Sequence, residues 1–332
     1  MLAEEKIIRL LDDVKEDGIL QSEIPRILNL SKSTVSEILS DLESRGEVIR
    51  KGISARSYRV WKAKYFPSPF PGLLRLGILK STEYAYLIIA ALKNNVIVKL
   101  FDDPIDLTRA LSQGRVDMAA SPLLTQVIMG ILMKNFKIFR IVAKNGSGIV
   151  FSNSKTGIFG TTEMSTMDRN LRKFLTRHGG KRVHERVHYF NSPKSMIESL
   201  KSGEIEGLAI WEPYLTMLKE DGFEIRHFNE VLGDFICCSL AVNVESLDIN
   251  GEKIENFLNS YDEICNKEFE EEELDLLASV LQFDRTLIEK SIKNYRFCPR
   301  TDIDEIKAYI RESGINLSEE SLSGVLDIKY LS

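Results

Sequence analysis

The sequence has few of the side chains that crosslinks and metal sites require. It holds four cysteines and four histidines in 332 residues. Cys237, Cys238, Cys265 and Cys298 lack the spacing of a zinc site and are too few for a disulfide framework. We therefore expect reduced thiols. The adjacent Cys237 and Cys238 are interpreted as small apolar residues of a packed strand, with a redox role for the pair as the alternative.

The sequence also lacks a long uninterrupted apolar run. Its first residues, MLAEEKIIRLLDD, contain neither the apolar core nor the cleavage site of a signal peptide. The best candidate for a membrane span, Leu123–Ala143, is interrupted by Lys134, Lys137 and Arg140. We therefore expect a cytoplasmic protein with no membrane partner.

Sequence patterns that resemble catalytic motifs each lack a required feature. HERVH, with His184 and His188, matches a zinc-protease signature that works only on a helix. The alternation with Val183 and Val187 predicts a strand, on which the two histidines would lie roughly 13 Å apart. GIFGTTEMS is not followed by the Gly-Lys-Ser/Thr of a phosphate loop, and no G-x-S-x-G nucleophile turn occurs. We predict no metal, no cofactor and no enzymatic activity.

Charge is distributed unevenly along the chain. The formal net charge is −5, which argues against a protein that coats nucleic acid throughout. Residues 26–64 nevertheless hold nine basic against four acidic side chains. A local excess of this kind attracts a polyanion more than the total charge does. The length of 332 residues predicts two or three domains.

The first 64 residues show the pattern of three helices and a strand pair. Apolar residues at helical spacing mark helices near residues 7–14, 24–28 and 35–42. Ser31 or Ser33 can cap the third helix, and Gly46 can end it. VIRKGISARSYRVW then alternates around Gly52, which predicts a hairpin.

This order of elements is similar to that of a winged helix-turn-helix. The run NLSKSTVSEILSDLESRGEVIRKG resembles the reading helix and wing of bacterial and archaeal transcription regulators. The resemblance implies a domain at residues 1–64 that binds double-stranded DNA, and a homodimer that reads paired half-sites. The side chains expected on DNA are Ser31, Lys32, Ser33, Thr34, Ser36, Arg50, Lys51 and Arg56. The alternative is a module of the same shape that contacts proteins.

A break in composition follows the predicted hairpin. KAKYFPSPFPG, residues 62–72, contains three of the nine prolines and cannot continue a helix or a central strand. We place the domain linker at residues 65–72. From residue 73 onward strands alternate with helices, which predicts an α/β fold with a largely parallel sheet.

Two segments of the remaining chain repeat one design. DLTRALSQGRVDMAAS, residues 106–121, and SMIESLKSGEIEGLAIWEP, residues 195–213, each combine a helix, a Ser/Gly turn and an apolar strand. ALSQGRVDMAASP, KTGIFGTTEMSTM and SLKSGEIEGLAIWEPY resemble the type 2 periplasmic binding protein fold. The resemblance is to the branch that captures nitrate, sulfonates and taurine and that includes the thiamin-pyrimidine synthases.

The resemblance implies a two-lobed ligand-binding domain at residues 73–332. Lobe 1 would comprise residues 73–150 and 240–332, and lobe 2 residues 151–239. LysR-type regulators have a similar layout, but a long dimerising helix follows their head domain, and here a proline-rich linker takes its place.

Ligands of open α/β folds bind at the carboxyl ends of strands, where helix N-termini offer free N–H groups. Four strand-to-helix turns of the sequence fit this position. The turns at the Ser/Thr residues suit an anionic or hydrogen-bonding group, the aromatic residues a flat body, and Glu83 or Glu212 an amino group. The expected ligand-binding residues are Ser81, Thr82, Glu83, Tyr84, Ser121, Thr161, Thr162, Ser165, Trp211, Glu212 and Tyr214.

The sequence thus favours a cytoplasmic, ligand-responsive transcription regulator. Its small-molecule effector, an oxoanion, a sulfonate or a small heterocycle, would bind between the lobes and change how paired heads hold DNA. Two other hypotheses stay open. One is a cytoplasmic solute-binding protein, or a thiamin-pyrimidine-synthase-like enzyme, with a head that does not bind DNA. The other is a protein-interaction adaptor.

Overall fold

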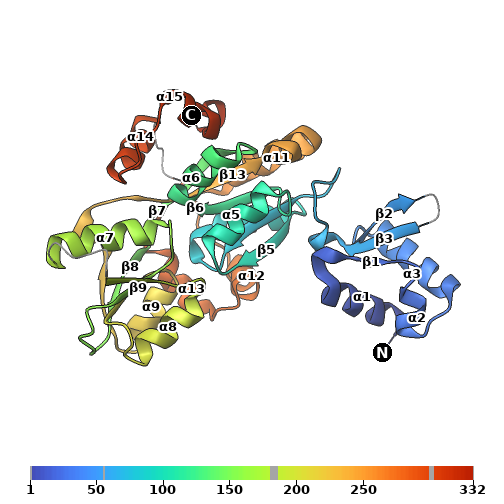
Figure 1. Ribbon diagram of the computed structural model, residues 1–332, viewed down its shortest axis with the longest axis horizontal. Coiled ribbons are helices and arrows are strands. Elements are labelled where there is room, and N and C mark those ends of the chain that lie inside the picture. The colour runs from blue at the N-terminus through green and yellow to red at the C-terminus, as the bar shows by residue number, and fades with distance from the viewer. Residues whose placement is uncertain (1, 55–56, 180–185, 299–302, 332) are drawn as a thin grey trace.

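A computed structural model describes residues 2–54, 57–179, 186–298 and 303–331. Figure 1 shows a small N-terminal unit, which we call the head, beside a larger body built around two sheets. None of the helices in the described part of the chain is long and apolar enough to cross a membrane.

The head combines three helices with a small antiparallel sheet of strand order β1-β3-β2. Its apolar residues, among them Leu11, Val35, Leu39 and Val60, form a core of their own. Ser31 caps the third helix by accepting a hydrogen bond from the backbone N–H of Thr34, as expected from the sequence. The elements are α1 (Ala3–Val14), η1 (Lys15–Asp17), β1 (Ile19–Leu20), α2 (Ile24–Leu28), α3 (Lys32–Ser44), β2 (Val48–Ser54) and β3 (Ser57–Lys62).

The first sheet of the body has the strand order β14-β7-β13-β6-β4-β5. Strands β4, β5 and β6 run parallel, whereas β13 lies antiparallel to both β6 and β7. The strands are β4 (Arg75–Leu79), β5 (Ile97–Phe101), β6 (Met118–Pro122), β7 (Phe136–Asn145), β13 (Ile236–Asn243) and β14 (Tyr295–Phe297). Packed with them are η3 (Thr82–Tyr84), α4 (Ala85–Lys93), α5 (Pro104–Ser112), α6 (Leu123–Met133) and α11 (Val244–Ile264).

The second sheet has the order β10-β9-β11-β8-β12 and is also mixed. Its strands are β8 (Ser147–Phe151), β9 (Phe159–Thr161), β10 (Val187–Tyr189), β11 (Gly207–Trp211) and β12 (Glu224–His227). Its helices are α7 (Thr166–Gly179), α8 (Pro193–Lys201), α9 (Tyr214–Glu220) and α10 (Phe228–Leu232). The expectation of largely parallel sheets is therefore correct only for β4–β6 and β9–β11. Strand β7 of the first sheet passes directly into β8 of the second, with only Gly146 between them.

The chain crosses between the sheets at two adjacent points. The first crossing is at Gly146, between β7 and β8, and the second precedes β13. The backbone N–H of Asn145 donates to the Phe235 carbonyl, and the Asn145 side chain binds Asp234. Gly146 has a φ of +71°, and a Cβ there would collide with the ring of Tyr295. Only glycine fits this crossing without displacing the ring.

The C-terminal helices flank both sheet units. Helix α13 (Arg285–Ile292) contacts η3, which packs with the first sheet, and α9, which packs with the second. Helix α14 (Ile303–Glu312) carries Glu312, which pairs with Arg169 and Lys173 of α7. Figure 1 shows α14 and α15 (Glu319–Val325) above the first sheet. The other helices are η2 (Ala63–Tyr65), α12 (Glu271–Leu281) and α16 (Ile328–Leu331).

Two of the cysteines are not reduced thiols, contrary to expectation. Cys265 and Cys298 form a disulfide, which links the end of α11 to the end of β14. Cys237 and Cys238 are free and buried. The sequence did not indicate the bond because the two residues are 33 positions apart and lack the context of a disulfide-rich domain.

A buried ion pair fixes the linker against the first sheet. Arg75, at the start of β4, donates to Asp117 at 2.9 Å, and both side chains are fully buried. The same guanidinium donates to the carbonyls of Phe66, Ser68 and Gly114. Asp117 also accepts from Ser246 of α11 at 2.7 Å.

We predict that Asp117→Asn destabilises the protein by about 3–5 kcal/mol, because it leaves a buried guanidinium without its counter-charge. Urea unfolding monitored by circular dichroism measures the loss. Asp106→Asn is the matched control: it breaks the exposed pair with Arg109 and should cost less than about 1 kcal/mol. Equal losses in the two variants would contradict the prediction.

Candidate functional site

The expected ligand residues converge where the two sheets face each other. Five of them, Ser81, Glu83, Tyr84, Thr162 and Trp211, line one small cavity together with Leu79, Pro104, Pro122, Met167 and Cys238. The cavity has a volume of about 10 Å³, and all eleven expected residues are buried. The remaining six are not among the residues that line it. The free volume is about that of one water molecule.

Direct hydrogen bonds join the two sheet units beside this cavity. The Ser81 hydroxyl donates to the carbonyl of Glu212 at 2.9 Å, and the Trp211 indole N–H donates to the carbonyl of Lys80 at 3.2 Å. The Thr125 hydroxyl donates to the carbonyl of Met164 at 2.8 Å. Ser81 and Trp211 were expected on a ligand, but in this state they bind the opposite sheet unit.

The hydroxyl residues at the start of α7 form a compact turn. Thr162 donates to the hydroxyl of Ser165 at 2.9 Å, and Ser165 accepts from the backbone N–H of Asp168 as the helix cap. Ser121 pairs with Thr108 at 2.9 Å. Among the described side chains, the buried hydroxyls of Thr82 and Thr161 have no hydrogen-bond partner. Such groups are costly unless another molecule satisfies them.

Glu212 and Tyr214 support the turn instead of lining the cavity. The Glu212 carboxylate accepts from the backbone N–H of Thr216 at 2.9 Å and from Asn294 at 2.6 Å. Burial raises the pKa of Glu212 above its usual 4.5. Tyr214 packs edge-on against Trp211 and Phe283.

Sequence reasoning missed two residues at this site. Cys238 lines the cavity, and Cys237 lies beside it. Glu83 receives hydrogen bonds from both thiols, and burial raises its pKa to about 8. The adjacent cysteines were visible in the sequence, but Glu83 lies about 150 residues away and only the fold brings it to them.

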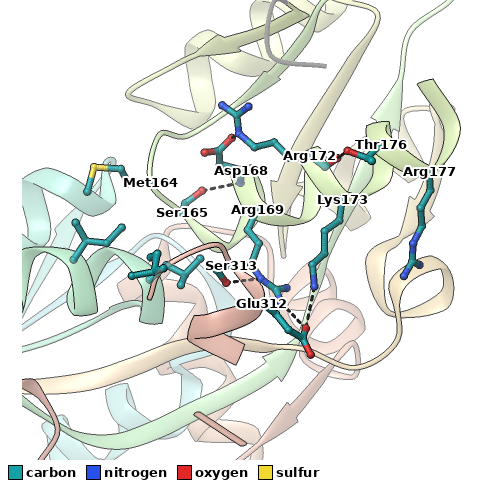
Figure 2. A pocket seen from close by; sticks show the side chains of 13 residues that line it. Met164, Ser165, Asp168, Arg169, Arg172, Lys173, Thr176, Arg177, Glu312 and Ser313 are labelled. Atoms are coloured by element: carbon teal, nitrogen blue, oxygen red, sulfur yellow. Dashed lines mark hydrogen bonds and ion pairs between the residues drawn. The ribbon is translucent and has the colours of Figure 1, made fainter. Parts of the chain in front are cut away.

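A larger groove opens on the other side of the Thr162–Ser165 turn. It has a volume of about 540 Å³, and its wall includes Ser165 and a face of α7 (Figure 2). Its charged lining residues are Arg169, Arg172, Lys173 and Arg177, against Asp168 and Glu312. Figure 2 shows Glu312 between Arg169 and Lys173. Four cations against two carboxylates give the groove an excess of positive charge, which attracts anions.

In the head, several of the residues expected on DNA make contacts within the protein. Arg50 forms an ion pair with Glu43, and the Lys51 ammonium lies 5.9 Å from the ring centre of Phe66. Ser31 caps α3 and binds the hydroxyls of Ser33 and Thr34. Lys32 and Ser36 lie on the same helix. Arg56 lies outside the described residues, as does His184 of the HERVH motif, whereas His188 lies on β10.

No protein-family model and no curated protein matches this chain. Solved structures with the same fold do exist. A ligand-binding component of an ABC-type import system from Staphylococcus aureus, solved with zinc bound, is 18% identical with a TM-score of 0.67. The alignment covers 78% of this chain and 97% of that one.

Two further structures are of proteins that bind a named solute. The nitrate-binding protein of Synechocystis is 16% identical, with a TM-score of 0.64 over 79% of this chain and 88% of that one. The alkanesulfonate-binding protein of Xanthomonas axonopodis, bound to MOPS, is 13% identical, with a TM-score of 0.61 over 78% and 99%. The chain therefore has the mixed α/β fold of periplasmic binding proteins, as the sequence predicted for the body.

The same findings correct the predicted function. These structures are ligand-binding proteins, and nothing in them points to DNA or to a regulator. The interpretation as a DNA-binding transcription regulator is therefore wrong. Of the side chains assigned to DNA, Arg50 forms an ion pair with Glu43. The homodimer was predicted because DNA readers bind paired half-sites, and without DNA binding that reason no longer applies.

We predict that Trp211→Phe favours opening of the two sheet units. The variant keeps a large ring but loses the hydrogen bond to Lys80, worth about 1 kcal/mol, so the open population rises about fivefold. The measurement is the rate at which a thiol reagent labels the free, buried Cys237 and Cys238.

Trp61→Phe is the matched control, because it removes a similar bond from Trp61 to the Glu16 carbonyl within the head. Its labelling rate should equal that of the unmodified protein. If Trp211→Phe labels no faster than Trp61→Phe, the Trp211–Lys80 bond does not hold the units closed.

We also predict a pH-dependent contribution from Glu212. Because its pKa is raised on folding, the folded protein retains a proton that the unfolded chain releases above pH 4.5. The stability of the protein relative to Glu212→Gln should thus fall as the pH rises from 4.5 through the folded pKa, by at most about 1.4 kcal/mol per pH unit. Urea unfolding of both proteins across this range measures the difference. If the unsubstituted protein instead gains stability relative to Glu212→Gln as the pH rises, the prediction is refuted.

Proposed function

We propose that this protein binds a small solute between the two sheet units of its body. The observation that carries the proposal is the convergence of Ser81, Thr162 and Trp211 from different sheets on one cavity. The analogy comes from two solved structures of this fold, a nitrate-binding protein and an alkanesulfonate-binding protein bound to MOPS. Binding without catalysis is in keeping with these neighbours, which are binding proteins.

The solute class that fits best is a small oxoanion or organic sulfonate. The turn before α7 offers the hydroxyls of Thr161, Thr162 and Ser165 next to a helix N-terminus, where anions are stabilised. The positive groove beside this turn would raise the local concentration of an anion. Solute entry requires the units to separate, since the closed cavity has a volume of only about 10 Å³.

The ligand-binding domain is proposed to begin at residue 73, after the linker at residues 65–72. The share of this chain covered by the S. aureus structure, 78%, equals the share that follows residue 72. Residues 1–64 are proposed to be a winged-helix-like unit by fold, on the basis of three helices and the β2–β3 hairpin. Trp61 and Phe66 join this unit to Leu73 and Ile97 of the body.

We expect a panel of nitrate, sulfate and alkanesulfonates to contain a solute that raises the melting temperature. A solute at one hundred times its Kd stabilises the native state by about 2.7 kcal/mol. Thr162→Val should weaken its binding about tenfold or more, because a hydrogen bond to a charged group is worth about 1.5–3 kcal/mol. Isothermal titration calorimetry measures the affinities.

Thr34→Val in the head is the matched control and should bind the solute normally. Lys173→Gln tests whether the solute binds in the groove or in the cavity, since Lys173 lines the groove and not the cavity. If Lys173→Gln abolishes binding while Thr162→Val binds normally, the groove is the site and the proposed cavity is wrong. If no solute of the panel changes the melting temperature, the anion class is wrong.

A further inference from the structure

A cluster of potential metal ligands lies at the edge of the small cavity between the sheet units. The carboxylate of Glu83, in η3, meets the thiols of Cys237 and Cys238 near the start of β13. One ligand atom from each of the three lies within 4.8 Å of the other two. All three side chains are buried, with at most 2% of any residue exposed.

The strand is locally irregular at the two cysteines. Adjacent residues of a regular strand point to opposite faces of the sheet. Here the pairing of β13 with β7 shifts register between Ile236 and Cys238 and again between Cys238 and Ser239. Irregularities of this kind re-aim side chains. The two sulfurs consequently lie only 3.7 Å apart.

The sulfur–sulfur distance matches that of a tetrahedral metal site, and the sulfur–oxygen distances are shorter by about 0.2–0.7 Å. With Zn–S bonds of about 2.3 Å and a Zn–O bond of about 2.0–2.2 Å, tetrahedral angles place two sulfurs about 3.8 Å apart and each sulfur about 3.5–3.7 Å from the oxygen. The sulfur–sulfur distance here is 3.7 Å. The Glu83 Oε2 atom lies 3.3 Å from the Cys237 sulfur and 3.0 Å from the Cys238 sulfur. Small displacements would admit the ion.

An unsatisfied atom also points to a missing ligand. The second carboxylate oxygen of Glu83, Oε1, is buried and makes no hydrogen bond within the described residues. The thiol hydrogen bonds to Oε2 therefore leave half of the carboxylate unsatisfied, and a cation would satisfy it. Tyr84 contacts the Cys238 sulfur through its hydroxyl at 3.2 Å and would orient that ligand from outside the coordination shell.

We propose that Glu83, Cys237 and Cys238 form a binding site for a thiophilic divalent cation of the zinc class. On binding, one metal–oxygen and two metal–sulfur bonds form, the two S–H bonds and the O–H bond of the protonated Glu83 carboxyl break, and the protons leave to solvent without any change of oxidation state. Three protein ligands leave a fourth position open. Since Glu83 and Cys238 line the cavity beside Thr162 and Trp211, that position is available to water or to a donor atom of a solute.

This site was not predicted from the sequence, because two of its ligands are adjacent and the third is remote. The site is independent of the proposed solute function, since metal can bind whether or not an anion does. The buried ligands require the sheet units to open before metal enters.

The test uses the full chain, stripped of metal by a chelator and with the Cys265–Cys298 disulfide intact. Titration with Cd²⁺ should produce a thiolate-to-cadmium absorption band that saturates at one ion per chain. An excess of Zn²⁺ should displace the cadmium ion and so remove the band. Cys237→Ser, Cys238→Ser and Glu83→Gln should each weaken binding by at least about 100-fold, since even outer-shell partners contribute about 10- to 100-fold. The double variant Cys265→Ser, Cys298→Ser is the control and should retain the band.

X-ray absorption of the zinc-loaded, unsubstituted protein tests the proposal without relying on variants that could fail to fold. Because only Cys237 and Cys238 are free thiols, two sulfur neighbours at about 2.3 Å are expected. A shell of oxygen and nitrogen alone, or a cadmium band that survives in Cys237→Ser and Cys238→Ser, would overturn the proposal. Anion titrations with and without chelator test the solute function separately. Anion binding that persists in the presence of chelator would support the solute function even if the metal proposal fails.

Discussion

The ion pair between Arg75 and Asp117 is the interaction on which the arrangement of the chain depends. It lies where the linker, β4, β6 and α11 meet, and every donor group of the guanidinium has an acceptor on one of these segments or on the adjoining Gly114 turn. A buried charge is tolerated only when it is fully paired. The pair therefore specifies one position of the linker, and with it the apolar contact of Trp61 and Phe66 against Ile97. Strand β4, which ends two residues before Ser81, begins at the same residue, Arg75.

The site between the sheet units combines a stable closed contact with groups left unsatisfied. Ser81, Thr125 and Trp211 exchange hydrogen bonds with backbone carbonyls of the opposite unit. Thr82, Thr161 and one oxygen of Glu83 meanwhile have no partner in the described part of the chain. Under the proposed solute binding, these unsatisfied groups would favour the bound state, because a solute can pair with them and the protein alone cannot.

Local patterns predicted most of the architecture. Apolar spacing located the three head helices, and the alternation from residue 73 indicated strands and helices of an α/β body. The recurring helix–Ser/Gly–strand design pointed to the binding-protein fold that the solved structures share. Strand direction was harder to predict from the sequence, because β13 and β14 pair with β7, which lies far away in the sequence. The disulfide between Cys265 and Cys298 was missed for the same reason, as was the contact of Glu83 with Cys237 and Cys238.

The sequence by itself determined the elements, the break at the proline-rich linker and the polar residues that end the strands, because these follow from periodicity and backbone chemistry within short windows. The basic balance of residues 26–64 suggested DNA, but charge counts ignore pairing, and Arg50 pairs with Glu43 in the fold. Only the tertiary structure decided which polar residues face the cavity and which are occupied by the opposite sheet unit. It also brought two thiols and a carboxylate together, since that contact depends on the packing of η3 against β13 and not on any local pattern.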